Sequence, residues 1–201
     1  AVLNGDHYIV NGQKTWTSLA QHANLMFCLV RTSDEGKRQE GISFLLVDMN
    51  QPGVTVQPIK TIDGSTEVNN VFLEDVKVPV DSRVGEENKG WTYAKYLLGH
   101  ERTSIAAVGR SKAQIKRLKT IASAEEHNGT ALINDQAFRE KIADIEIDLL
   151  ALESLVLRVL SDESAGKGPG PEASFLKIKG TEVQQGITEL LIEAIGNYAH
   201  P

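Results

Sequence analysis

The chain has 201 residues, of which 41% are hydrophobic and 24% are charged, and its formal net charge is −6. This length suffices for one sizeable hydrophobic core or two small ones. The mild acidity and the lack of a basic patch interleaved with aromatic residues argue against nucleic-acid binding. The single cysteine, Cys28, cannot form an internal disulfide, so the sequence predicts a reducing, cytoplasmic compartment.

The sequence gives little indication of a membrane-spanning segment or of a metal site. No stretch approaches the roughly 18 consecutive apolar residues of a transmembrane helix, so we expect no membrane association. The five histidines do not show the helical spacing of metal ligands, and we expect no metal site. The chain begins at Ala1, without an initiator methionine and in mid-pattern, so we expect it to be part of a longer protein.

The first 80 or so residues have the pattern of β-strands. β-favouring residues flank Asn11-Gly12, which is a strong hairpin signal. Two apolar runs, LMFCLVRT and ISFLLVDM, are separated by a polar loop, and Pro52-Gly53 marks a turn before VTVQPI. A further strand, VNNVFLEDVKVP, ends at Pro79, which cannot donate to a ladder. Because no helices intervene between these strands, we predict an antiparallel sheet, as a barrel or sandwich.

The composition changes at DSRVGEENKG, and the rest of the chain is typical of helices. We therefore predict a β-domain over residues 1–85 and a helical domain over residues 86–201. A first helix is predicted from Gly90 to about Ser123. Asn134 or Asp135 is expected to cap a second helix with a long apolar stripe, and GKGPGP separates it from a third. The predicted fold class is α+β, with an antiparallel β-domain followed by an antiparallel helical bundle.

Glu101 falls within the apolar stripe of the first predicted helix. It lies four residues after Leu97 and four before Ile105, so a 3.6-residue period turns it toward the core. Burial disfavours the charged form of a carboxylate. Glu101 is therefore either paired with the neighbouring Arg102 or kept as a catalytic acid or base, and the residues alone favour the ion pair.

Trp16 stands in a strand pattern with hydroxyl residues beside it, Thr15, Thr17 and Ser18. A flat indole next to hydrogen-bond donors suits a planar heteroaromatic ligand. The alternative is a tryptophan in the sheet core with surface threonine and serine residues, and the residues alone favour this second interpretation.

Three segments resemble the FAD-dependent acyl-CoA dehydrogenases. YIVNGQKTWTSLAQHANLMFCLVRT and VFLEDVKVPVDSRVGEENKGW are similar to the middle β-domain of that family, and LLGHERTSIAAVGRSKA is similar to the start of its C-terminal helical domain. The segment GWTYAKYLLGHERT most resembles the branch of the family that includes pimeloyl-CoA dehydrogenase large subunits. The resemblance implies that three of four bundle helices are present.

The resemblance also implies site residues. In the family, the strand with the tryptophan runs alongside the flavin, so Trp16, Thr17 and Ser18 are expected to bind FAD, with the Ser18 hydroxyl at flavin N5. A catalytic glutamate precedes an arginine in the helix that opens the C-terminal domain, which assigns the base to Glu101 and substrate binding to Arg102. Other members place the base in a later Tyr-x-Gly motif, and this rival stays open.

The chain departs from the family pattern in two places. HNGTALINDQAFRE replaces an Arg-x-x-Phe-Gly segment that reaches the FAD of a neighbouring subunit. Of the Gln-x-x-Gly-Gly stretch at the end of the third helix only Gly196 is kept, as a cofactor-binding candidate, and Glu193 brings an acid near the expected pyrophosphate.

The implied function is α,β-dehydrogenation of an acyl-CoA thioester to a trans-2-enoyl-CoA, as in fatty acid metabolism, with electrons passed to an electron-transfer flavoprotein. We expect a homodimer or homotetramer, or a hetero-oligomer, and no activity from this stretch of chain alone. The alternatives are an acyl-CoA oxidase or flavin monooxygenase of the same fold, or a non-catalytic subunit of a hetero-oligomeric dehydrogenase.

Overall fold

The computed structural model describes residues 1–168 and 170–199, apart from the side chains of residues 102–104. The chain divides into two compact units, Ala1–Tyr96 and Leu97–Pro201. The predicted domain boundary at residue 85 stays a prediction; the last long strand ends at Pro79 and the first α-helix begins at Gly90. Among the described helices, none combines the length and the apolar composition that crossing a membrane requires.

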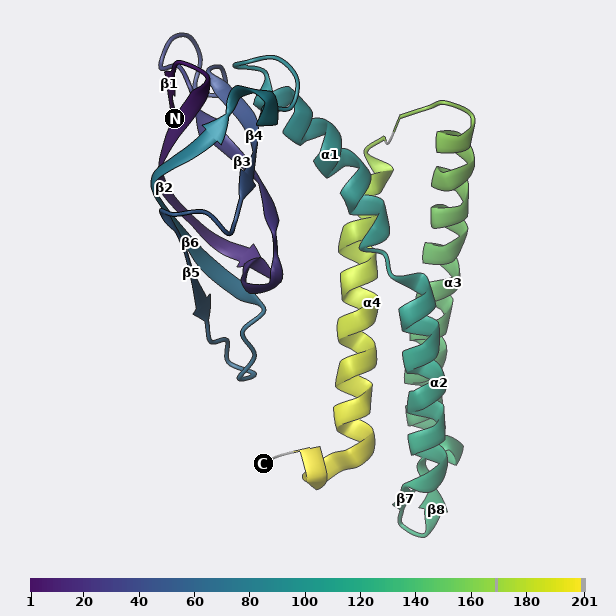
Figure 1. Ribbon diagram of the computed structural model, residues 1–201. Coiled ribbons are helices and arrows are strands. Elements are labelled where there is room, and N and C mark those ends of the chain that lie inside the picture. The colour runs from purple at the N-terminus through teal and green to yellow at the C-terminus, as the bar shows by residue number, and fades with distance from the viewer. Residues whose placement is uncertain (169, 200–201) are drawn as a thin grey trace. The chain divides into compact units, whose positions relative to one another are not determined.

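The first unit contains an antiparallel four-stranded sheet and an antiparallel pair of strands (Figure 1). The sheet has the order β1-β2-β6-β5, and these strands are Val2–Asn4, His7–Ser18, Val68–Pro79 and Val54–Ile59. The pair consists of β3 (Leu25–Arg31) and β4 (Ile42–Asp48), and short 3₁₀ helices occupy Ala20–His22 and Val80–Ser82. The antiparallel β-domain predicted from the sequence is confirmed.

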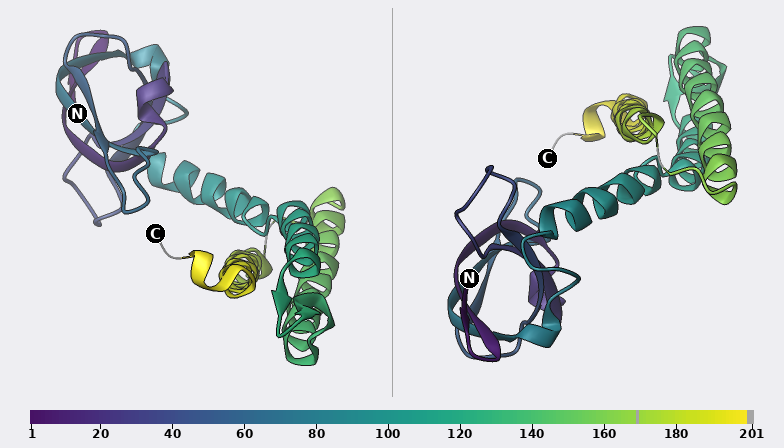
Figure 2. Two further views of the ribbon diagram at one scale, coloured as in Figure 1. Left: turned by 90° about the horizontal axis from the view of Figure 1, so that it is seen from below. Right: turned by 90° about the horizontal axis from the view of Figure 1, so that it is seen from above.

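Both sheets contribute to one hydrophobic core. Along β3, the buried residues Met26, Cys28 and Val30 alternate with more exposed ones, as the two-residue period of a strand requires. Leu45 and Val47 of β4 join them, together with buried residues of β2 and β6. Seen end-on in Figure 2, the strands curve around this core like a barrel.

The dipeptide Asn11-Gly12 does not form the predicted hairpin. Strand β2 runs through it with a shift in its register against β6, which is a β-bulge. The Asn11 amide donates to Asp75 Oδ1 at 2.9 Å, and its oxygen accepts from the Asp75 N–H at 2.8 Å. These bonds tie Asn11 to the bulged residue Asp75 of β6, and the turn between β1 and β2 lies instead at Gly5 and Asp6.

The hydroxyl of Tyr8 links β2 to the segment that precedes the first helix. Tyr8 is fully buried, and its hydroxyl donates to Glu87 Oε1 at 2.8 Å and accepts from Arg83 Nη1 at 2.8 Å. Burial, followed by the hydrogen bond to Glu87, raises the pKa of Tyr8 above its ordinary value. The network therefore stabilises the protonated, neutral form of this phenol.

Among the described residues, four α-helices follow: α1 (Gly90–Ser104), α2 (Val108–Ala124), α3 (Gln136–Ser164) and α4 (Glu172–Ile195). This part of the chain also contains the hairpin strands β7 (Glu126–His127) and β8 (Thr130–Ala131) and 3₁₀ helices at Leu132–Asn134 and Gly196–Ala199. In Figure 1, α2 and α4 run in one direction and α3 runs in the other. The second and third predicted helices are confirmed, and Asp135 caps α3 by accepting from the Phe138 N–H at 2.8 Å.

The first predicted helix is wrong as a single element, because the chain breaks between α1 and α2. Ala107 adopts a φ of 46°, which a helix interior excludes. Ala106 is buried, and its backbone approaches α4 so closely that a Cβ on Gly180 would lie 2.6 Å from the Cα of Ala106. Packing of this turn against α4 thus overrides the local helix propensity of the segment.

Tyr8 generates a prediction about alkaline pH. Because its pKa is raised on folding, the folded state holds the proton more tightly than the unfolded chain. This contribution to stability is present below pH 10 and is lost as the pH rises above it. Tyr8→Phe should lower the free energy of unfolding by about 1–2 kcal/mol at neutral pH. Above pH 10, the free energy of unfolding of the variant should fall less steeply with pH than that of the wild type. Urea unfolding checks both, and an unchanged alkaline loss in the variant would contradict the assignment.

Gly180 generates a second prediction, with Gly109 as its control. Gly180→Ala should lower the free energy of unfolding by about 1–3 kcal/mol, since the new methyl group meets the Ala106 backbone. Gly109→Ala on α2 places its methyl group in open space and should be neutral or stabilising by up to about 1 kcal/mol. Thermal unfolding of both variants measures the difference, and equal melting temperatures would argue against the close contact.

Candidate functional site

Trp16 is exposed on a strained bulge of β2. Lys14 pairs with Val71 and Thr17 pairs with Asn69, so β2 has one extra residue between these two points. The indole is 65% exposed, and Trp16 has a φ of 62°, a left-handed conformation that non-glycine residues rarely adopt. The interpretation of Trp16 as a core residue is therefore wrong, because the bulge turns its side chain out of the sheet.

Polar contacts from β6 hold the strand immediately after this bulge. Asn69 is fully buried, and its Nδ2 donates to the Thr17 carbonyl at 3.0 Å and to Gln21 Oε1 at 2.6 Å. The Leu19 N–H donates to the Glu67 carbonyl at 2.7 Å. Residues in sparsely populated backbone conformations cost of order 1–3 kcal/mol and persist only where the surroundings fix them. The buried amide of Asn69 supplies that restraint here.

The exposed surface beside Trp16 can bind a planar ring. Ser18 is exposed, and within residues 1–168 and 170–199 its hydroxyl has no hydrogen-bond partner. Thr17 is half-buried, and its carbonyl is already engaged by Asn69. An accessible indole with a hydroxyl two residues away combines a stacking face and a donor, which suits a heteroaromatic ligand with polar ring atoms.

Glu101 does not have the buried position that its helical period predicted. The side chain of Glu101 is exposed, and Leu97, one turn earlier, is 41% exposed. Ala94 is the one fully buried side chain among those described in α1, and the buried core of the bundle begins only at Ala106. Glu101 is therefore not part of the buried core of the helical unit.

Arg102 and Gly196 are the two remaining candidate site residues. The side chain of Arg102 lies outside the described residues. Gly196 ends α4 with a φ of 53°, and Glu193, one turn earlier, accepts from Lys141 Nζ at 2.6 Å. This ion pair offsets the negative charge that the sequence brings close to Gly196, so the expected repulsion of an anion there is weakened.

Trp16, Thr17 and Ser18 lie in the first unit, whereas Glu101 and Gly196 lie in the second. Sequence reasoning missed Asn69, which fixes the backbone at Thr17. The available signal was an asparagine pair inside a predicted strand, since asparagine is depleted in strands.

Two family models match adjoining parts of the chain. The model described as the acyl-CoA dehydrogenase middle domain matches residues 1–76. The model described as the acyl-CoA dehydrogenase C-terminal domain matches residues 88–200.

Individual relatives agree with this match. Acyl-CoA dehydrogenase FadE26 of Mycobacterium tuberculosis is 34% identical over 206 residues, which cover 99% of this chain and 51% of FadE26. The fold is similar to an acyl-CoA dehydrogenase structure from Geobacillus kaustophilus, with a TM-score of 0.91, 28% identity, and 100% and 54% of the two chains covered. The ChsE4-ChsE5 complex from M. tuberculosis gives a TM-score of 0.85 and 34% identity, over 98% and 51% of the chains. The chain thus spans about half the length of these relatives.

The hydrogen bonds of Asn69 predict a local effect on the Trp16 surface. Asn69→Ala should lower the free energy of unfolding by about 1–3 kcal/mol and speed hydrogen exchange of the Leu19 amide, because the restraint on Thr17 is lost. Asn70→Ala is the matched control: Asn70 is half-buried and accepts only a long 3.5 Å bond from Gln13. Equal exchange rates in the two variants would show that Asn69 does not fix this segment.

Proposed function

Because this chain belongs to the acyl-CoA dehydrogenase family, we propose that the whole protein dehydrogenates an acyl-CoA thioester to a trans-2-enoyl-CoA. The single observation that carries the proposal furthest is the exposed, strained Trp16 beside an accessible Ser18 hydroxyl. A tryptophan packed in the core would have offered no surface for a flavin, whereas this one presents its indole outward.

The residues of the first unit fit FAD. The indole of Trp16 would lie against the isoalloxazine ring, and the hydroxyls of Thr17 and Ser18 would donate to its polar atoms. When bound, FAD supplies the acceptor at N5 for the hydride that leaves the substrate β-carbon. Gly196 is the proposed contact with the pyrophosphate, where Lys141 balances the charge of Glu193.

Glu101 is the proposed base. Its carboxylate would take the α-proton of the thioester while the β-carbon loses a hydride, so that one proton and one hydride leave and a trans double bond forms. An exposed carboxylate is accessible to a substrate, and exclusion of water when acyl-CoA binds would raise its basicity. Arg102, the next residue, is the proposed substrate-binding cation.

The whole protein is also proposed to act as an oligomer and to pass its electrons to an electron-transfer flavoprotein. The outer face of α3 exposes the large apolar residues Ile147, Leu150 and Leu157, which share one side of the helix. An exposed apolar face of this kind is typical of a surface that a partner covers. The ChsE4-ChsE5 relative favours a second, different subunit as one form of that partner.

Glu101→Gln in the full-length protein tests the base. Turnover of acyl-CoA should fall about a hundredfold to ten-thousandfold, because an amide cannot accept the α-proton. The absorption spectrum of bound flavin should stay unchanged, which separates lost chemistry from lost cofactor.

The control is Glu126→Gln, which removes an exposed carboxylate from β7 and should leave turnover unaffected. Turnover of Glu101→Gln within a few-fold of the wild type would remove Glu101 as the base and favour a glutamate outside this chain.

A further inference from the structure

The start of α1 is fixed to strand β4 by main-chain contacts. Before the helix, the Val84 N–H donates to the Phe44 carbonyl at 2.8 Å. Gly90, the first residue of α1, is buried, and a Cβ added to it would lie 2.6 Å from the carbonyl carbon of Ser43. Any larger residue at this position would push the helix away from the strand, so the first residue of α1 is held directly on the β4 backbone.

Three polar groups form a ring of hydrogen bonds within this contact. The Asn88 N–H donates to Ser43 Oγ at 2.8 Å, Ser43 Oγ lies 2.7 Å from Thr32 Oγ1, and Thr32 Oγ1 lies 2.7 Å from Asn88 Oδ1. Asn88 Oδ1 can only accept, so Thr32 donates to it and the Ser43 hydroxyl donates to Thr32. The Gly41 carbonyl, 3.2 Å from Thr32 Oγ1, already accepts from two backbone N–H groups. Each hydroxyl of the ring then donates once and accepts once, an arrangement in which hydrogen bonds strengthen one another.

The ring holds a backbone conformation that is unfavourable on its own. Asn88 has a φ of 65°, which asparagine tolerates better than most residues but which still costs free energy. Ser43 is 0% exposed, so water cannot take the place of the Asn88 N–H at its hydroxyl. The chain is therefore fixed in one conformation two residues before α1 begins.

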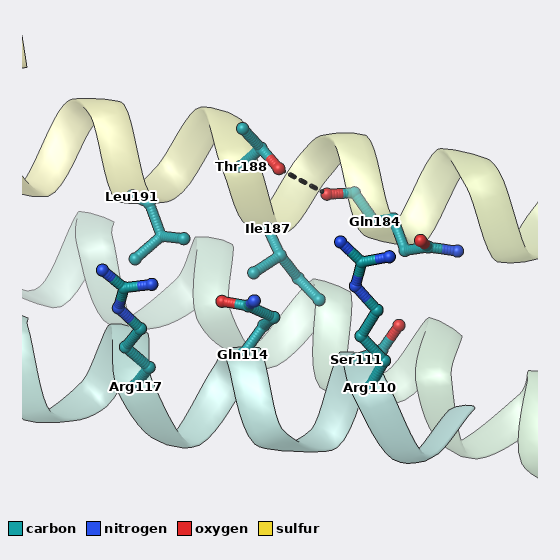
Figure 3. A pocket seen from close by; sticks show the side chains of 8 residues that line it. All are labelled: Arg110, Ser111, Gln114, Arg117, Gln184, Ile187, Thr188 and Leu191. Carbon is teal, nitrogen blue, oxygen red and sulfur yellow. Dashed lines mark hydrogen bonds between the residues drawn. The ribbon is translucent and has the colours of Figure 1, made fainter. Parts of the chain in front are cut away.

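Both ends of α1 are held by the chain around them. In its first turn, the Tyr93 hydroxyl accepts from the Glu86 N–H at 2.9 Å, which joins the helix to the segment before it. After its last turn, the backbone of Ala106 packs against Gly180, and Figure 3 shows α2 beside α4 beyond this turn. Glu101 lies between these two fixed ends.

The position of Glu101 is sensitive to the direction in which α1 starts. Glu101 comes eleven residues after Gly90, which is about 16 Å along the helix at a rise of roughly 1.5 Å per residue. A change of about 10° in the direction of the first turn would displace Glu101 by roughly 3 Å. A misplacement of about 1 Å can slow a reaction roughly a hundredfold.

We propose that Thr32, Ser43 and Asn88 are positioning residues for the dehydrogenation, because their ring sets where α1 starts and therefore where the Glu101 carboxylate lies. This inference rests on the proposed role of Glu101 as the base. The three residues act through the helix and touch neither substrate nor flavin. A ring that only stabilised the β-domain would leave the rate of proton abstraction unchanged, and this difference can be measured.

Kinetics of the full-length, flavin-loaded protein test the proposal. Thr32→Val keeps the shape of the side chain and removes the hydroxyl that closes the ring. It should lower kcat about tenfold to a hundredfold, change KM less than about threefold and leave the flavin spectrum unchanged. The kinetic isotope effect with an acyl-CoA deuterated at its α-carbon should rise, because proton abstraction becomes slower than the other steps. Thr32→Ser restores the hydroxyl and should return kcat to within about twofold of the wild type.

Asn88→Gly gives a second arm. Glycine adopts a positive φ freely and keeps the N–H bond to Ser43, but it lacks the acceptor for Thr32, so kcat should fall in the same way. Val30→Ala is the control for stability alone, since Val30 is a buried core residue of β3 outside the ring. This variant should lower the melting temperature and keep kcat within about twofold of the wild type.

The possible failures can be told apart. An unchanged kcat in Thr32→Val, together with loss of turnover in Glu101→Gln, would overturn the positioning role and leave the proposed base in place. Equal losses of kcat in Val30→Ala and Thr32→Val, or no recovery in Thr32→Ser, would mean that the ring contributes to stability alone. Turnover retained by Glu101→Gln would remove the proposed base and this inference with it.

Discussion

The proposed flavin surface depends on one constraint, the bulge that turns Trp16 out of strand β2. A regular strand would alternate its side chains between core and solvent, but the register of β2 against β6 shifts by one residue between Lys14 and Thr17. The left-handed backbone at Trp16 is unfavourable on its own. The buried amide of Asn69 helps to offset this cost by donating to the Thr17 carbonyl, immediately after the bulge.

A second constraint, the close approach of Ala106 to Gly180, organises the helical unit. It ends α1, starts α2 in a new direction and leaves the first turn of α2 without a cap. Because Glu101 precedes this turn, it stays outside the buried core of the bundle. The same turn brings the first residues of α2 beside α4.

Most of the fold could be predicted from local pattern. The apolar runs that became β3 and β4, the end of β6 at Pro79 and the Asp135 cap of α3 are set by alternation, proline chemistry and capping, which act over a few residues. The predictions that were wrong concern segments whose conformation depends on tertiary contacts. Asn11 bonds to Asp75 at a bulge of β6 instead of forming a turn, whereas Asn128-Gly129, with both φ angles positive, forms the tight turn between β7 and β8.

The candidate site was harder to predict than the fold for the same reason. The position of Trp16 depends on Asn69, which lies 53 residues away in the chain, and no period within β2 reveals the extra residue. The inward turn expected for Glu101 assumed one continuous helix, but the break at Ala107 removes the packing partners that this expectation required. Family resemblance identified the residue types of the site, whereas burial and backbone strain had to come from the structure.

A crystal structure of the full-length protein with FAD bound tests the central claim most directly. The account predicts that the isoalloxazine ring lies against the Trp16 indole, with the Ser18 hydroxyl within hydrogen-bond distance of the ring and the Asn69 contact to Thr17 intact. A flavin bound elsewhere, with the Trp16 bulge still open to solvent, would contradict it.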